Sequence, residues 1–188
     1  MSLPTGSHPG HAVVVAGFGT EYRHDDGVGI VVAERLAALV GDVSDIGPVI
    51  DPLDLLGRWD DADLAIVVDA VHSGASPGTL RLIELMPPSP PATAVRPEDH
   101  AGSDSVGAGS AVSREQRGSG VTSSHGIGLV GVVKLARAVG HAPKRVVVVG
   151  IEGDNFAQGT GLSPSVARAV PEAVDKVVRM IEEARRCV

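Results

Sequence analysis

Three residues suited to metal binding or acid–base chemistry stand next to the ends of predicted elements. Asp26 lies in the polar loop after one apolar strand, Asp69 directly follows a second such strand, and His125 stands at the predicted start of a helix. Two carboxylates and one imidazole can ligate a divalent transition metal and leave open positions for a substrate. The same groups can also transfer protons without a metal. Residue type alone therefore leaves both kinds of site open.

The segments that must position these residues alternate between strands and helices. Continuous valine-rich runs, typical of strands buried in a parallel sheet, occur at 12–16, 64–68 and 145–150. Apolar residues recur at helical spacing over 25–40, after 122–124 as far as 140, and after Ser163 and Pro164. We expect Pro171 to kink or divide this last helix. Since ligands collect at the carboxyl ends of strands in open α/β sheets, neighbouring strands would bring Asp26 and Asp69 together, with His125 beside them.

Two weaker strands complete the predicted sheet. The segment 48–51 begins with a proline, which cannot donate to a strand ladder, so we place it at the sheet edge. The segment 79–85 alternates between apolar and polar residues, and the nine residues 70–78 before it are too few for a parallel crossover. It should therefore be antiparallel. The predicted fold class is α/β: a three-layer α/β/α sandwich around a five-stranded, mostly parallel sheet with one antiparallel strand.

The length of 188 residues predicts a single domain over residues 1–188. One part of it differs in composition from the rest. Residues 87–120 hold 5 Pro, 5 Gly and 6 Ser, with no Leu, Ile or Phe that would anchor them to a core. We expect a mobile surface insertion there.

Composition excludes several classes of partner. A net charge of −7 and an aromatic content of 2% argue against binding to nucleic acid. No apolar run approaches the ~18 residues of a membrane span, so we expect no membrane partner. Cys187 is the only cysteine, which rules out a disulfide framework and a cysteine zinc site. The sequence suits a reducing compartment, and the predicted location is cytoplasmic.

Several residues near the acidic groups have simpler structural interpretations. Asp25 fits the N-cap of the helix that follows it, because a carboxylate there satisfies free helix N–H groups. His24 and His72 flank the carboxylates and are possible ligands, although exposed loop histidines are common. Gly17 and Gly19 begin a G-x-G-x-x-G pattern that lacks its third glycine, which argues against a dinucleotide site.

In combination, these segments give the chain a resemblance to the hydrogenase maturation protease family. The resemblance covers about residues 12–185 apart from the insertion. It rests on GFGTEYRHDDGVG at 17–29, IVVDAVHSG at 66–74 followed by GT at 78–79, SSHGIGL at 123–129, GIE at 150–152 and GTGLSP at 159–164. The first motif is the most specific, since its acidic pair begins eight residues beyond Gly17 and is followed by another glycine.

The resemblance implies an endopeptidase that removes a C-terminal extension from the large subunit precursor of a nickel-iron hydrogenase after nickel insertion. It implies that Asp26, Asp69 and His125 contact the metal and carry the catalysis. It also implies that nickel belongs to the substrate, so that the site can be empty in the isolated protein. The implied fold is a phosphorylase/hydrolase-like twisted five-stranded sheet between helices, in agreement with the pattern of elements.

Two positions depart from the family pattern, and two other functions stay open. Thr20 stands where the family usually has Asn, and Asp26 replaces the common Glu, which shortens the reach of this ligand by ~1.5 Å. A nucleotide-binding regulatory module is one alternative, with the first loop cradling phosphate, although that loop is acidic and no lysine precedes Lys134. A metal-free acid peptidase, in which Asp26 and Asp69 share a proton, is the other.

Overall fold

The computed structural model describes residues 13–41, 45–60, 62–86 and 126–186. The strands are β1 (Val13–Phe18), β2 (Asp45–Val49), β3 (Leu64–Val71), β4 (Leu80–Met86) and β5 (Arg145–Glu152). The α-helices are α1 (Val28–Leu39), α2 (Gly126–Val139) and α3 (Pro164–Arg186). Two short 3₁₀ helices, η1 (His24–Gly27) and η2 (Pro52–Gly57), follow β1 and β2. Every predicted strand and helix is present, with bounds shifted by a few residues.

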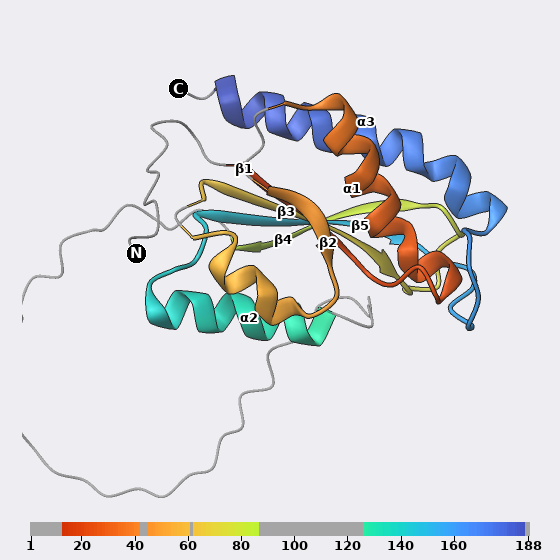
Figure 1. Cartoon of the computed structure of the whole chain (residues 1–188), viewed down its shortest axis with the longest axis horizontal. Coiled ribbons are helices and arrows are strands. Elements are labelled where there is room, and N and C mark those ends of the chain that lie inside the picture. Colours follow the sequence, from red (N-terminus) through yellow and green to blue (C-terminus); the bar gives the residue numbers. More distant parts are fainter. Residues whose placement is uncertain (1–12, 42–44, 61, 87–125, 187–188) are drawn as a thin grey trace, which may run out of the picture.

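The five strands form one sheet in the order β2-β1-β3-β5-β4 (Figure 1). β1 pairs in parallel with β2 and with β3, and β3 pairs in parallel with β5. β4 pairs with β5 in the antiparallel sense, which confirms the prediction drawn from the short connection before it. β2 lies at the sheet edge, as its proline indicated. The neighbouring positions of β1 and β3 place the loops after them at one edge of the sheet.

Helices cover both faces of the sheet (Figure 1). One core cluster joins α1 and α3 to residues such as Ile66 and Val149, and a second cluster joins α2 and η2 to the intervening residues, such as Val67 and Val148. Successive residues of a strand therefore point to opposite faces of the sheet, and both faces are buried. The predicted three-layer sandwich is confirmed. None of the helices in the described ranges is long and apolar enough to cross a membrane.

Two glycines let the start of α1 pack directly on the sheet. A Cβ atom at Gly17 would lie 2.2 Å from the carbonyl oxygen of Gly29, and one at Gly29 would lie 2.4 Å from the carbonyl oxygen of Val68. Backbone meets backbone at both points, so no side chain can be accommodated by a rotamer change. This close approach fixes the beginning of α1, and with it the loop that precedes the helix, against β1 and β3.

Pro171 does not divide the last helix, which contradicts that part of the expectation, and another expectation lies outside the described residues. α3 runs without division from Pro164 to Arg186 through Pro171. The proline ring is exposed, and buried residues on both sides of it, including Val170 and Val174, keep the helix packed on the sheet. Tertiary packing thus outweighs the missing backbone donor. The insertion predicted at 87–120 lies outside the described residues.

Candidate active site

Two of the three predicted site residues lie at the same edge of the sheet. Asp26 belongs to η1 after β1, Asp69 belongs to β3, and η1 packs against β3. Both side chains are buried, with exposed fractions of 1% and 2%. His125 lies outside the described residues, and α2 begins at the next residue, Gly126. The structure therefore brings two carboxylates to the carboxyl edge without describing the imidazole.

A tight backbone turn holds the Asp26 carboxylate. The backbone N–H of Thr20 donates a hydrogen bond to Asp26 Oδ2 at 3.1 Å. Gly19 adopts a φ of +126°, and a Cβ atom there would lie 1.7 Å from the carbonyl oxygen of Asp26. Only glycine satisfies both the dihedral angle and the space at this position. The first loop of the chain thus folds back on itself and directs an amide at the carboxylate.

Asp25 is not the helix N-cap that the sequence suggested. No side chain caps either η1 or α1. Instead, Asp25 Oδ2 accepts hydrogen bonds from the backbone N–H groups of Asp154 and Asn155 at 2.9 and 2.8 Å, and Oδ1 accepts one from Ser163 at 2.6 Å. Burial would raise the pKa of Asp25, but these hydrogen bonds outweigh it, so the pKa lies below the ordinary value. Asp25 is a buried, charged cross-link between two loops.

Glu152 is a second buried carboxylate of this kind, and its role was missed from the sequence. It ends β5 and is 1% exposed. Its carboxylate accepts hydrogen bonds from Ser73 N and Ser73 Oγ, both at 2.7 Å, and from Gly74 N at 2.9 Å. Burial acts to raise the pKa of Glu152, and the hydrogen bonds from Ser73 and Gly74 lower it to below the ordinary value. The sequence signal that could have indicated this role is the acidic residue at the end of a valine-rich buried strand.

His24 and His72, which flank the acidic residues, contact residues of the neighbouring loop. His24 has a φ of 47°, and its Nδ1 lies in hydrogen-bond contact with the carbonyl oxygen of Gly161 at 3.0 Å. The ring of His72 meets that of Phe156 edge to face, with centroids 6.2 Å apart. Within the described ranges, no group of three or more His, Cys, Asp or Glu side chains is arranged to hold a metal. Neither histidine therefore completes a metal site with the two aspartates.

The loop after β1 has few backbone N–H groups free to bind a phosphate group. Of the eight backbone N–H groups in residues 19–26, all but that of Glu21 donate to other groups of the chain. A phosphate cradle needs several free amides directed at the ligand. The loop also carries buried carboxylates, which repel an anion. These observations argue against the nucleotide-binding alternative.

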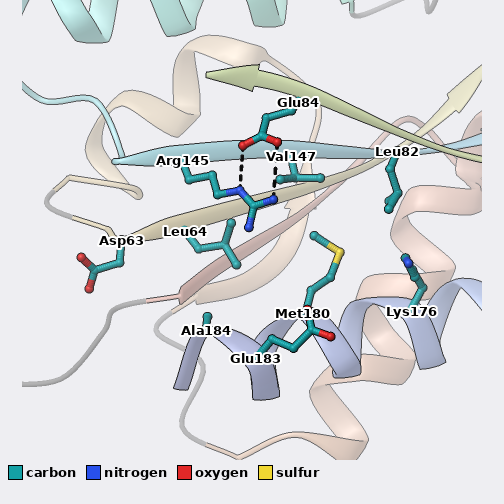
Figure 2. Close-up of a pocket in the computed structure, with 10 residues that line it drawn as sticks. All are labelled: Asp63, Leu64, Leu82, Glu84, Arg145, Val147, Lys176, Met180, Glu183 and Ala184. Atoms are coloured by element: carbon teal, nitrogen blue, oxygen red, sulfur yellow. Dashed lines mark hydrogen bonds and ion pairs between the residues drawn. The ribbon is translucent and has the colours of Figure 1, made fainter. Parts of the chain in front are cut away.

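Two cavities differ in their relation to the carboxylates. A cleft of about 490 Å³ is lined by residues 20, 22–23 and 158–160, and it adjoins Asp26 through Thr20. A cavity of about 400 Å³ lies between α3 and the strands, where Arg145 and Glu84 form an ion pair (Figure 2). This second cavity contacts Leu64 and Arg145, the first residues of β3 and β5, and so lies at the opposite, amino edge. Of these two cavities, the first adjoins the candidate site.

Comparison with known proteins gives matches in both sequence and structure. The family model described as hydrogenase maturation protease matches residues 114–180. The hydrogenase expression/formation protein HupD of Rhodobacter capsulatus is 28% identical over 173 residues, an alignment that covers 89% of this chain and 70% of the relative. HupD of Rhizobium leguminosarum bv. viciae is 25% identical over 186 residues, covering 96% and 79%.

Solved structures extend the match over most of the described fold. The hydrogenase maturating endopeptidase HybD from E. coli superimposes with a TM-score of 0.67 at 20% identity, covering 92% of this chain and 93% of the other. The [NiFe] hydrogenase maturation protease HybD from Thermococcus kodakarensis gives a TM-score of 0.60 at 19% identity, covering 90% and 98%. At these identities the structural matches establish the fold.

Proposed function

We propose that the chain is a member of the hydrogenase maturation protease family, and that it is an endopeptidase that removes a C-terminal extension from the large subunit precursor of a nickel-iron hydrogenase. The observation that carries this proposal is the pair of buried carboxylates, Asp26 and Asp69, at the ends of neighbouring parallel strands. Burying a carboxylate is costly, and buried ionisable groups concentrate at functional sites.

The precursor's nickel is the proposed recognition mark, and it is part of the substrate. Asp26, Asp69 and His125 would contact it. Asp69 supports this grouping, because the alternation along β3 puts it on the same side as Val67, in the face that α2 covers. His125 directly precedes α2. Carboxylate and imidazole ligands suit nickel, and a shell without thiolates favours transient contact over storage.

In the proposed reaction, the side chains of the chain orient the precursor and move protons. One of the two aspartates accepts a proton from water as the water oxygen adds to the scissile carbonyl carbon. The carbon–nitrogen bond then breaks, and the leaving amine takes up the proton that this aspartate accepted from water. The N–H group of Thr20 fixes one oxygen of Asp26, which reduces the reorientation needed during the reaction. The single cysteine is compatible with this processing in the reducing cytoplasm.

The decisive experiment compares nickel-loaded and nickel-free large subunit precursor. Each is incubated with the protein, and the products are weighed by mass spectrometry. We expect a C-terminal peptide to be lost from the loaded precursor only, because the free precursor lacks the ion that the site recognises. Loss of no peptide from either precursor would contradict the proposed function.

A matched pair of histidine variants tests the metal contact. His125→Ala should abolish processing of the loaded precursor. His141→Ala should leave it unchanged, because His141 pairs with Asp60 before β3, at the amino edge. Full cleavage of nickel-free precursor, together with an active His125→Ala variant, would replace this account with the metal-free peptidase in which Asp26 and Asp69 share a proton.

A further inference from the structure

Asp25 joins two loops that lie far apart in the sequence. Its three hydrogen-bond donors, Asp154, Asn155 and Ser163, are 129, 130 and 138 residues away. The backbone reinforces the contact, since the N–H of Asp25 donates to the carbonyl oxygen of Asn155 at 3.0 Å. The Asp25 side chain is fully buried, so water cannot replace these bonds. Hydrogen bonds to an ionised carboxylate are about twice as strong as neutral ones.

The surrounding backbone leaves this loop little freedom to relax. The N–H of His24 donates to the carbonyl oxygen of Gly159, and the N–H of Gly159 donates to the carbonyl oxygen of Tyr22, both at 3.0 Å. His24 is the non-glycine residue with a positive φ in the described ranges, a conformation that costs energy and persists only where neighbouring contacts enforce it. The contacts across to residues 154–163 supply that enforcement.

Asp26 is the next residue of the same four-residue 3₁₀ helix. Its N–H donates to the carbonyl oxygen of Arg23, and its carboxylate accepts from Thr20. Both contacts lie within residues 19–27. The Asp25 carboxylate ties the same short helix to the β5 side of the site. A displacement of this short helix at Asp25 would carry Asp26 with it.

We propose that Asp25 is a positioning residue, whose carboxylate anchors η1 to the segment 154–163 and thereby sets the place of the Asp26 carboxylate. The inference rests on the proposed function, in which Asp26 contacts the substrate. The two adjacent acids then have different roles: Asp26 acts at the reacting centre, and Asp25 acts only by positioning Asp26.

The test replaces the Asp25 carboxylate by an amide of the same shape. In Asp25→Asn, an NH₂ group must face at least one backbone donor. The expected result is a fall in kcat of at least ~10-fold on nickel-loaded precursor, because small displacements of a reacting group carry losses of up to ~100-fold. The KM for the precursor should stay within about twofold, since peptide contacts elsewhere are unchanged. Both constants are measured well below the melting temperature, where a purely structural defect leaves kcat unaltered.

Glu152→Gln is the matched control. It makes the same chemical change in another buried carboxylate held by backbone amides, but Glu152 anchors Ser73 and Gly74 rather than η1. We expect a comparable loss of thermal stability and a smaller loss of kcat than in Asp25→Asn. Equal losses of kcat in the two variants, or an unchanged kcat in Asp25→Asn, would overturn the positioning role.

Amide hydrogen exchange gives a readout that needs no substrate. The Thr20 N–H reports on the place of the Asp26 carboxylate, to which it donates. In Asp25→Asn it should exchange at least ~10-fold faster, together with the amides of Asn155 and Ser163. Unchanged protection of Thr20 while those two amides open would overturn the inference. Faster exchange at Thr20, in a protein that cuts neither precursor, would support the positioning role while the proposed function fails.

Discussion

Acidic side chains differ in burial and in ion pairing between the two edges of the sheet. At the carboxyl edge, four carboxylates are at most 2% exposed: Asp25, Asp26, Asp69 and Glu152. At the amino edge, three acidic residues reach solvent and pair with basic side chains: Asp60 with His141, Asp63 with Lys144, and Glu84 with Arg145. Figure 2 shows the pair of Glu84 and Arg145.

The difference lies in what compensates the negative charge. Lysine and arginine neutralise Asp63 and Glu84 at the amino edge, and solvent screens the charges there. At the carboxyl edge, backbone N–H groups hold Asp25 and Glu152. Amide dipoles fix the geometry of a carboxylate and favour its ionised form without cancelling its formal charge. This difference fits the proposal that the carboxyl edge, and not the amino edge, contacts the metal of the substrate.

The largest contrast is expected in activity. Asp26→Ala and Asp69→Ala should each lower processing of the nickel-loaded precursor by more than ~100-fold, because each removes a group that acts on the substrate in the proposed reaction. Asp63→Ala at the amino edge should keep the full rate. The measurement is precursor cleavage followed by mass spectrometry, with circular dichroism to verify the fold. A near-normal rate in either of the first two variants would remove that residue from the site.

Glycine-to-alanine substitutions should cost more stability at the carboxyl edge than at the amino edge. Gly19→Ala places a methyl group against the Asp26 carbonyl and requires a φ that alanine avoids, so it should cost at least ~2 kcal/mol. Gly41→Ala, after the end of α1, meets open space and should change stability by less than ~0.5 kcal/mol. Chemical denaturation measures both free energies of unfolding. Equal costs would show that the first loop is less constrained than its contacts indicate.

Acid should weaken the carboxyl edge. The pKa values of Asp25 and Glu152 lie below their ordinary values of 3.8 and 4.5, so both contribute stability that is fully present above those values. This stability is lost as the pH falls from about those values through the lowered pKa values of the folded state. Asp25→Asn and Glu152→Gln should each cost ~1–3 kcal/mol at pH 7 and make unfolding less dependent on pH below 4.5. Urea unfolding at a series of pH values measures the slope, and a variant with the parent's slope would contradict this assignment.

The smallest effect is expected at the amino edge. Glu84→Gln removes the ion pair with Arg145, whose side chains are 38% and 51% exposed. The free energy of unfolding should change by less than ~1 kcal/mol, because solvent and salt screen such pairs, and the cost should shrink further in 1 M salt. Processing activity should be unaffected. A cost that is large and independent of salt would show that this pair resembles the amide-held carboxylates of the other edge.

Local patterns in the sequence determined the elements and much of their arrangement. The valine runs at 12–16, 64–68 and 145–150 predicted β1, β3 and β5 because a strand buried on both faces needs apolar side chains at every position. The nine residues 70–78 between the two predicted strands indicated the antiparallel direction of β4, since so short a connection cannot cross over the sheet. The same reasoning placed Asp26 and Asp69 at a common edge, because both follow neighbouring parallel strands.

Only the tertiary structure decided which groups hold the acidic residues in place. Asp25 looked like an N-cap from its neighbours, yet its donors come from 129 to 138 residues later in the chain. Glu152 likewise finds Ser73 and Gly74 at a distance of 78 to 79 residues. Pro171 was expected to kink or divide a helix that in fact runs undivided, with buried residues on both sides of the proline. Hydrogen bonds between distant loops exist only after the sheet has brought those loops together, so no local pattern can encode them.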